Sequence, residues 1–315
     1  MKRFVKIALI ISAVLAAVGI LLVVVSGFMG GRFSDLWSDR MQMPAFFRFG
    51  IRPTTPGNEY RESNTYTISA DGIDAVQIDW VSGDVTIKIG ETDQIVFSES
   101  GAGLAEETAL RYAVQGSTLG IHYCDNQNFV NINLPSKQLT VILPATLAAN
   151  LREISVGTVS ADVTIDDPAF HMEKLDVETV SGNLNAVLDF AGKMELETVS
   201  GNLSVNGAIS EFEANSNSGF LSVTGGIKKF ETESISGDVL LDCRNSAPRE
   251  LDIETNSGSV VLQLPTDADL TLTYETVSGN FDSALAMGIH NGNYVIGGGR
   301  SKWNVETVSG NLTVK

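Results

Sequence analysis

Apolar and polar residues alternate along most of the chain beyond residue 65. In residues 84–89 and again in residues 175–178, every second side chain is apolar and those between are charged or hydroxylated. Successive side chains of a strand point to opposite faces of a sheet, so each apolar set lines one buried side. Helical periodicity is scarce in the same region. The pattern therefore predicts an all-β body.

A short phrase, Glu-Thr-Val-Ser-Gly-Asn, recurs in step with this alternation, at residues 178–183, 197–202 and 306–311, and with a following Phe at 275–280. From Ser160 to Ser278 the serines recur every 18 to 21 residues, a period typical of repeat architectures. The predicted corners of the repeat are Ser82, Gly83, Ser181, Gly182, Ser200, Gly201, Ser218, Gly219, Ser236, Gly237, Ser257, Gly258, Ser278, Gly279, Ser309 and Gly310.

Two architectures suit such a repeat. In a parallel β-solenoid, or β-helix-like fold, each rung stacks on the last at about 4.8 Å. In an antiparallel meander the Ser-Gly pair would be a two-residue hairpin turn, but such turns prefer Asn-Gly or Asp-Gly. The near-constant period favours the solenoid, and the meander stays as the alternative. Glycine at a corner is explained by its access to positive φ, and the Thr and Asn positions are expected to pass hydrogen bonds along the stack.

The regular array is predicted to cover residues 151–315, after an irregular β opening or cap in residues 65–150. Strands are expected near 112–115, 119–123 and 139–143, the first two joined by a hairpin. The last unit is longer than the others, and its glycine run before Arg300 suits a closing hairpin, with Trp303 plugging the end. A phosphate nest at Gly297-Gly298-Gly299-Arg300 is the alternative reading of that run.

The N-terminus has the features of an export signal. Residues 1–6 are basic and predicted to be cytoplasmic, and residues 7–28 contain no charge. An apolar stretch of this length, at about 1.5 Å per residue, spans the roughly 30 Å hydrocarbon core, which predicts a transmembrane signal anchor. A cleaved signal peptide is the alternative. Residues 29–64 form a juxtamembrane connector, so the body is predicted to be extracytoplasmic on a single-pass protein of the cell membrane.

Charge and cysteine content narrow the possibilities. The chain carries 21 Lys+Arg against 38 Asp+Glu, a net charge of −17, which argues against nucleic acid as a partner. Cys124 and Cys243 have no metal-type spacing. Cys243 shares the inward parity of its strand, so a buried free thiol is favoured over a disulfide.

No residue pattern for catalysis emerges. His122, His171 and His290 have no metal-ligand spacing, and neither a nucleophile elbow nor a phosphate-binding loop is present. The repeated serines are too regular for nucleophiles, which need a base of their own. We therefore expect no enzyme, with a polysaccharide-acting β-helix enzyme as the alternative; such an enzyme would need two carboxylates at a defined separation.

Acidic residues take the outward parity of the repeat. The predicted stripe consists of Asp176, Glu178, Glu195, Glu197, Glu213, Glu231, Glu233, Asp252, Glu254, Glu275 and Glu306. A solvated face explains such a stripe without any ligand. The functional alternative is a binding site for divalent cations such as calcium, whose ligands are oxygens, or for a cationic peptide. No other cofactor is expected.

The recurrent phrase also carries a resemblance. Together with Ile235-Ser236-Gly237-Asp238, the strand end at residues 141–144 and the glycine-rich closing unit, it resembles the bacterial "putative adhesin" family of β-strand-repeat proteins, which includes LiaG-like cell-envelope proteins. The resemblance covers roughly residues 66–315. It implies a location at the cell envelope, with adhesion or stress-linked roles. From these observations together we expect a non-enzymatic interaction or scaffolding module at the cell envelope, with a cell-wall polymer, a cationic peptide or a protein as partner. The resemblance supplies no catalytic residues. Ser160-Ala161 and residues 217–220 depart from the phrase, so distorted corners are expected there.

Overall fold

The computed structural model describes residues 65–101, 104, 108–124 and 135–315. The predicted cytoplasmic start, membrane anchor and connector, residues 1–64, lie outside these ranges. Within the described residues, no helix combines the length and the apolar character that crossing a membrane requires.

The described chain is almost entirely strand. Its elements are β1 (Thr65–Ser69), β2 (Ala75–Gly90), β3 (Gln94–Ser100), β4 (Arg111–Gln115), β5 (Thr118–His122), β6 (Lys137–Pro144), α2 (Ala145–Ala148), β7 (Leu151–Asp166), β8 (His171–Thr179), β9 (Leu184–Thr198), β10 (Leu203–Ser216), β11 (Leu221–Thr224), β12 (Ile227–Ser234), β13 (Val239–Asp242), β14 (Glu250–Thr255), β15 (Val260–Gln263), β16 (Leu270–Thr276), β17 (Phe281–Ser283), β18 (Gly288–His290), β19 (Asn293–Ile296), β20 (Ser301–Thr307) and β21 (Leu312–Val314). The predicted all-β class is confirmed, and the strands expected near 112–143 are present as β4, β5 and β6.

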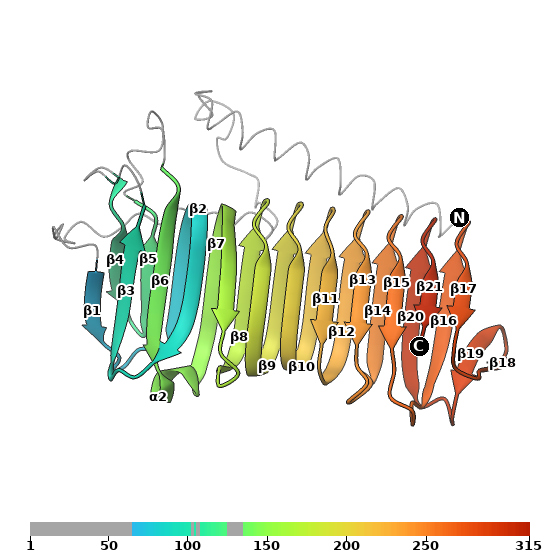
Figure 1. Ribbon diagram of the computed structural model, residues 1–315. Coiled ribbons are helices and arrows are strands. Elements are labelled where there is room, and N and C mark those ends of the chain that lie inside the picture. The colour runs from blue at the N-terminus through green and yellow to red at the C-terminus, as the bar shows by residue number, and fades with distance from the viewer. Residues whose placement is uncertain (1–64, 102–103, 105–107, 125–134) are drawn as a thin grey trace, which may run out of the picture.

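Equivalent strands of successive repeats pair in parallel. Phe212 of β10 lies beside Met194 on one side and Phe230 on the other, and the β9–β10 register shifts once, between Asn206 and Ala208. Figure 1 shows the result as a row of narrow loops, each with an ascending strand, a corner at the upper edge and a descending strand. Parallel pairing between repeats rules out the antiparallel meander for this array.

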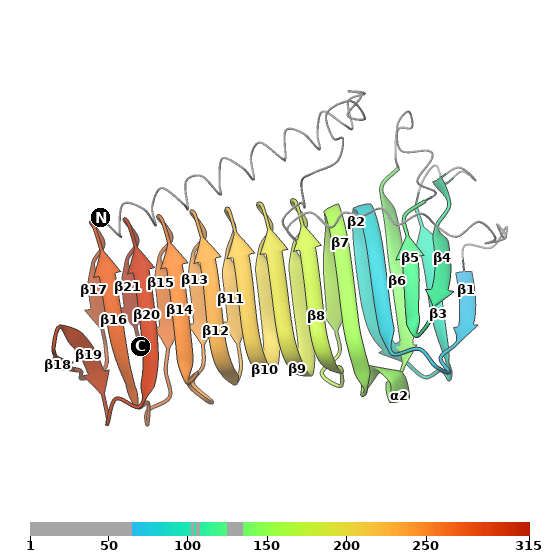
Figure 2. The same cartoon turned by 180° about the vertical axis from the view of Figure 1, so that it is seen from behind.

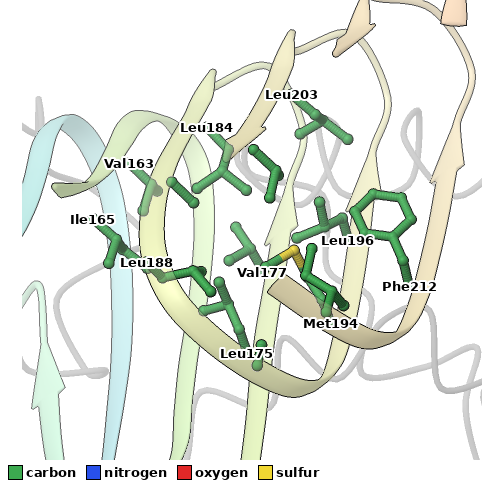
Figure 3. Packing of buried hydrophobic residues seen from close by; sticks show 14 of the residues in the cluster. Val163, Ile165, Leu175, Val177, Leu184, Leu188, Met194, Leu196, Leu203 and Phe212 are labelled. Atoms are coloured by element: carbon green, nitrogen blue, oxygen red, sulfur yellow. The ribbon is translucent and has the colours of Figure 1, made fainter. Parts of the chain in front are cut away.

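The core lies between the ascending and descending strands. Figure 3 shows Leu175 and Val177 of one strand set and Leu184 of the other pointing into the same space. These three side chains are at most 2% exposed. Because each rung repeats the last, like side chains stack: the rings of Phe212 and Phe230 lie 4.9 Å apart and parallel within 2°. Burial of these columns is the main stabilising contribution to the fold.

Three side chains of the phrase hold the corner. The Ser200 hydroxyl donates to the carbonyl of Val180 in the preceding rung at 3.4 Å. The Thr198 hydroxyl accepts the N–H of Gly201 in its own corner at 2.8 Å. The Asn183 side-chain oxygen accepts the N–H of Asn202 in the next rung at 3.0 Å. The expected Asn ladder is therefore present as side chain to backbone, whereas the threonine hydroxyls mainly bond within their own corner.

The corner glycines have a different cause from the one predicted. Among the corner glycines only Gly83 and Gly219 have positive φ, at 105° and 127°. A Cβ on Gly201 would instead fall far inside the van der Waals distance of the Gly182 carbonyl oxygen, and the same holds along the column. Glycine is required there because rungs approach closely, so the prediction from φ is wrong for most of these corners. At Ser160-Ala161, β7 continues through the corner without a break, from the residues that pair with β8 to those that pair with β9.

The chain does not stack strictly in sequence order. At one end β2 lies between β7 and a rung made of β5 and β6, and β1, β3 and β4 add antiparallel strands. At the other end β20 lies between β14 and β16, and β21 between β15 and β17. Figure 2 shows both arrangements from behind. The final strand of the chain is thus paired on both sides.

This interleaving changes two expectations for the last unit. Trp303 does not plug the end: it is 2% exposed within the stack, and its indole N–H donates to the Pro248 carbonyl at 2.9 Å. The end is instead filled by the rings of Tyr274, Phe281 and Tyr294. The expected closing hairpin is present as β18–β19, which pairs antiparallel with β16.

The glycine run before Arg300 does form an anion nest, but its anion belongs to the chain. The Asp269 carboxylate accepts the backbone N–H of Arg300 at 3.0 Å and lies 2.6 Å from the Arg300 Nε. These backbone donors, with those of Gly298 and Gly299, lower the pKa of Asp269. The Asp269 carboxylate therefore occupies the position at which the alternative hypothesis placed a phosphate.

Candidate functional site

The outward side chains of the ascending strands form three columns, which we call columns A, B and C. Strand register aligns column A as Glu153, Lys174, Lys193, Glu211, Lys229, Glu250, Lys302 and Thr271. Column B is Ser155, Asp176, Glu195, Glu213, Glu231, Asp252, Asn304 and Thr273. Column C is Gly157, Glu178, Glu197, Asn215, Glu233, Glu254, Glu306 and Glu275. The acids predicted as one stripe thus occupy two adjacent columns, B and C.

Lysines of column A reach the acids of column B. Lys174 Nζ lies 2.9 Å from Asp176 and 2.6 Å from Glu195, and Lys193 pairs with Glu195 and with Glu213. Partial burial acts to raise the pKa of Glu195, but the hydrogen bonds from both lysines outweigh it and lower that pKa. In this part of the face, the negative charge of column B is therefore largely neutralised by the lysines of column A.

Column C differs at Glu178 and Glu197. Partial burial, followed by repulsion from neighbouring carboxylates, raises the pKa of each to about 7. Among the described residues, the Oε2 atom of Glu197 is buried without a hydrogen-bond partner. The neighbouring carboxylates of columns B and C disfavour the charged forms of Glu178 and Glu197, which costs stability when all of them are ionised. A cation placed between them would relieve that repulsion.

Nothing in the described part of the chain forms a ready metal centre. No group of three or more His, Cys, Asp or Glu side chains lies in positions that could hold a metal ion there. Calcium takes six to eight oxygens at about 2.3–2.6 Å, whereas acids on adjacent rungs are about 4.8 Å apart along the stack. The columns thus offer carboxylates one or two at a time, and calcium binding would need water or a partner to complete its shell.

The three histidines lie on different strands, and the two cysteines lie far apart in the sequence. His122, His171 and His290 lie on β5, β8 and β18, and the first two face Asp79 and Asp189. Cys124 and Cys243 are both buried free thiols, which confirms the thiol reading over a disulfide. Burial raises the pKa of Cys243 to about 12, so it is held as the unreactive thiol.

A groove of about 570 Å³ lies at the C-terminal end of the outward face. Its floor is formed by β12, β14, β20 and β16, and Asn293 of the hairpin lines one side. Sequence reasoning missed this groove because its floor depends on β20 entering between two strands that precede it in the chain. The only signal available was the unusual length of the last repeat.

Comparison with solved structures finds low-identity relatives. A "putative adhesin" from Parabacteroides merdae is 13% identical, with 80% of this chain and 95% of that chain covered and a TM-score of 0.47. A "putative lipid binding protein" from Parabacteroides distasonis is 17% identical, with coverage of 80% and 96% and a TM-score of 0.49. A "putative cell adhesion protein" from Clostridium sporogenes is 13% identical, with coverage of 81% and 99% and a TM-score of 0.30.

Their descriptions name adhesins and a lipid-binding protein, and none of these three names an enzyme. At TM-scores below 0.5 these likenesses say nothing about the function of this chain. No curated protein matches the chain. The family model described as Toastrack DUF4097 matches residues 73–315, which is most of the sequence. The narrow parallel loops of Figure 1 thus belong to a known family: this protein is a member of the Toastrack DUF4097 family, whose structural neighbours include proteins described as "putative adhesins".

Proposed function

We propose that this protein is a non-enzymatic binding module, anchored in the cell membrane by residues 7–28, with its β-stack outside the cytoplasm. The observation that supports this most directly is the outward face of the stack. It presents columns of charged and amide side chains in fixed register, on strands that are paired on both sides. Such a surface is pre-ordered, so a partner that binds it pays little ordering entropy in the protein.

The outward acids repeat from rung to rung, whereas a hydrolase needs one carboxylate pair set apart from the rest. The apolar run of residues 7–28, which follows a basic start, supports anchoring. A cell-wall polymer or an envelope protein is the partner we propose for the face.

The test first determines the membrane topology of the protein and then measures its binding to cell-wall material. The full chain with a C-terminal tag is expected in the membrane fraction, and protease added to protoplasts should remove the tag and the body. Detergent-purified full chain should sediment with isolated cell-wall material. Recovery of the protein in the soluble cytosol, or protection of the tag in intact protoplasts, would refute the proposal.

A second candidate function is binding of cationic peptides through column C. The raised pKa values of Glu178 and Glu197 favour it, because an approaching cation would stabilise both carboxylates. Oligolysine should then bind the full chain, with affinity that falls as salt rises. Glu178→Gln combined with Glu197→Gln should weaken binding more than Glu195→Gln, whose residue is already paired with two lysines. Equal losses in both variants would remove this candidate, and a parallel calcium titration tests the metal version.

A further inference from the structure

At the groove at the C-terminal end of the outward face, neutral side chains replace the acids of column B. Interleaving inserts β20 between β14 and β16, so Lys302 and Asn304 stand beside Glu250 and Asp252. Beyond them, column B ends in Thr273 rather than another acid. Figure 1 shows β19 beside β16 at this end of the row, with β18 beyond it. The groove therefore combines a floor from four strands with a side wall that no middle rung has.

Hydrogen bonds fix the polar side chains of the groove in orientation. The Asn304 amide donates to Asp252 Oδ1 at 3.0 Å, and the Thr273 hydroxyl donates to Asn293 Oδ1 at 3.2 Å. Asn293 and Thr273 thereby tie the hairpin to the floor. Among the described residues, the side-chain Nδ2 of Asn293 and the side-chain Oδ1 of Asn304 make no hydrogen bond to protein. These are a double donor and an acceptor held ready at the groove surface.

The charges of the groove select against ionic ligands. Lys229 and Lys302 line it together with Glu231, Glu250 and Asp252. An anion would meet these carboxylates, and a cation would meet the two ammonium groups. The neutral amides and hydroxyls between them, by contrast, match a ligand that donates and accepts hydrogen bonds without carrying charge.

We propose that this groove binds a neutral oligosaccharide. Each sugar hydroxyl both donates and accepts, so vicinal hydroxyls can donate to the outer oxygen of Asp252 and accept from the Asn293 amide or Lys302. The volume of about 570 Å³ falls within the range of roughly 300–1,000 Å³ usual for small-ligand sites. This inference rests on the proposed binding function and names a ligand class for one part of the face.

The test uses the full chain in detergent with two neutral glycans, maltotriose and triacetylchitotriose, titrated by calorimetry. At least one should bind to the unaltered protein. Asn293→Ala and Asn304→Ala, made separately, should each weaken binding about tenfold or more, equivalent to about 1.4 kcal/mol. Asn215→Ala is the matched control, because Asn215 is an outward asparagine in column C of the middle rungs. It should leave binding unchanged.

Three outcomes would overturn the inference. Neither glycan binds, or binding is unchanged in both groove variants while they remain folded, or Asn215→Ala weakens binding as much as they do. The proposed function fails separately. If cell-wall sedimentation persists in Asn293→Ala and Asn304→Ala although no glycan binds, the groove inference is wrong and the binding module stands. If a glycan binds but the protein is cytosolic, the groove inference stands and the proposal of a membrane-anchored module outside the cytoplasm is wrong.

Discussion

The middle of the stack and its two ends solve the same problem with different residues. From β8 to β15, each rung has a like neighbour on both sides, so one phrase and its variants supply most of the corner bonds. The ends lack one neighbour and must close the core and satisfy the backbone with residues that occur once. Lys137 with Glu99 does this at one end, and Tyr274, Phe281 and Tyr294 with the Asp269 nest do it at the other. Repetition therefore encodes the stacking, and single residues encode closure.

Lys137 is the extreme case of a unique residue at an end. It stands beside Gly83 in the glycine column and is 0% exposed. Its Nζ donates to Glu99 at 2.8 Å, to the Thr108 carbonyl at 2.6 Å and to the Tyr123 carbonyl, so all three ammonium protons are used. The ammonium also lies 3.8 Å from the centre of the Tyr123 ring. Burial lowers its pKa, which the Glu99 carboxylate partly opposes.

The two regions should differ most in the stability that is lost when one lysine is replaced in each of them. Lys137→Met leaves Glu99 buried without its cation and should lower the free energy of unfolding by about 3–5 kcal/mol. Lys193→Met, in column A of the middle, removes only exposed ion pairs and should cost about 1 kcal/mol or less. Chemical denaturation of both variants measures the difference. Equal losses would mean that the end is no more dependent on its single residues than the middle.

Glycine variants should give the next largest effect, now within the middle. Gly201→Ala places a methyl group against the Gly182 carbonyl and should cost about 1–3 kcal/mol, because the rungs must separate. Gly226→Ala is the control, since its added Cβ would lie 3.6 Å from that of Ser246, an ordinary contact. The control should be neutral or slightly stabilising through the unfolded chain. Thermal melts of both variants measure the difference. A Gly201→Ala variant as stable as the control would contradict the close approach of rungs as the reason for glycine at these corners.

The sequence predicts the middle well and the ends poorly, for a physical reason. Alternation and period fix which residues of the phrase face the core, so the placement of Leu175 and Thr198 could be read directly. The order of rungs cannot be read in this way: β20 fits equally well beside β14 or beyond β16, because the columns match in both. Trp303 was therefore expected at the end but lies within the stack. The groove depends on that same ambiguity.

The electrostatic details of the outward face were also beyond the pattern. Glu195 and Glu197 share a parity, a strand and a residue type, yet the structure lowers the pKa of one and raises that of the other. The cause is which column the lysines of neighbouring rungs can reach. Sequence spacing places the acids on one face, but only the register shows that Lys174 and Lys193 serve column B.

A smaller effect is expected from the corner hydroxyls of the middle. Thr198→Val keeps the shape of the side chain but leaves the Gly201 N–H without its acceptor at 2.8 Å. The free energy of unfolding should fall by about 1–3 kcal/mol, toward the lower end if water reaches the corner. Thr164→Val on the outward face of β7 is the matched control and should change little. A Thr198→Val variant as stable as this control would show that the corner bond contributes nothing beyond what the core supplies.

The smallest effect concerns how pH acts on the two acidic columns. The pKa values of Glu178 and Glu197 are about 7 in the folded protein, above the ordinary 4.5, so the folded state binds more protons between these values. Their contribution to stability is therefore present below about pH 4.5 and is lost as pH rises toward about 7. Glu178→Gln with Glu197→Gln should remove this loss, raising the melting temperature at about pH 8 relative to the unaltered protein, with little change at about pH 5. Glu195→Gln should instead lower the melting temperature at about pH 8. The pKa of Glu195 is lowered in the folded protein, so its carboxylate stabilises the fold at pH values above its ordinary pKa of 4.5, and that contribution disappears as pH falls. Parallel pH profiles for all three proteins would mean that columns B and C are electrostatically alike.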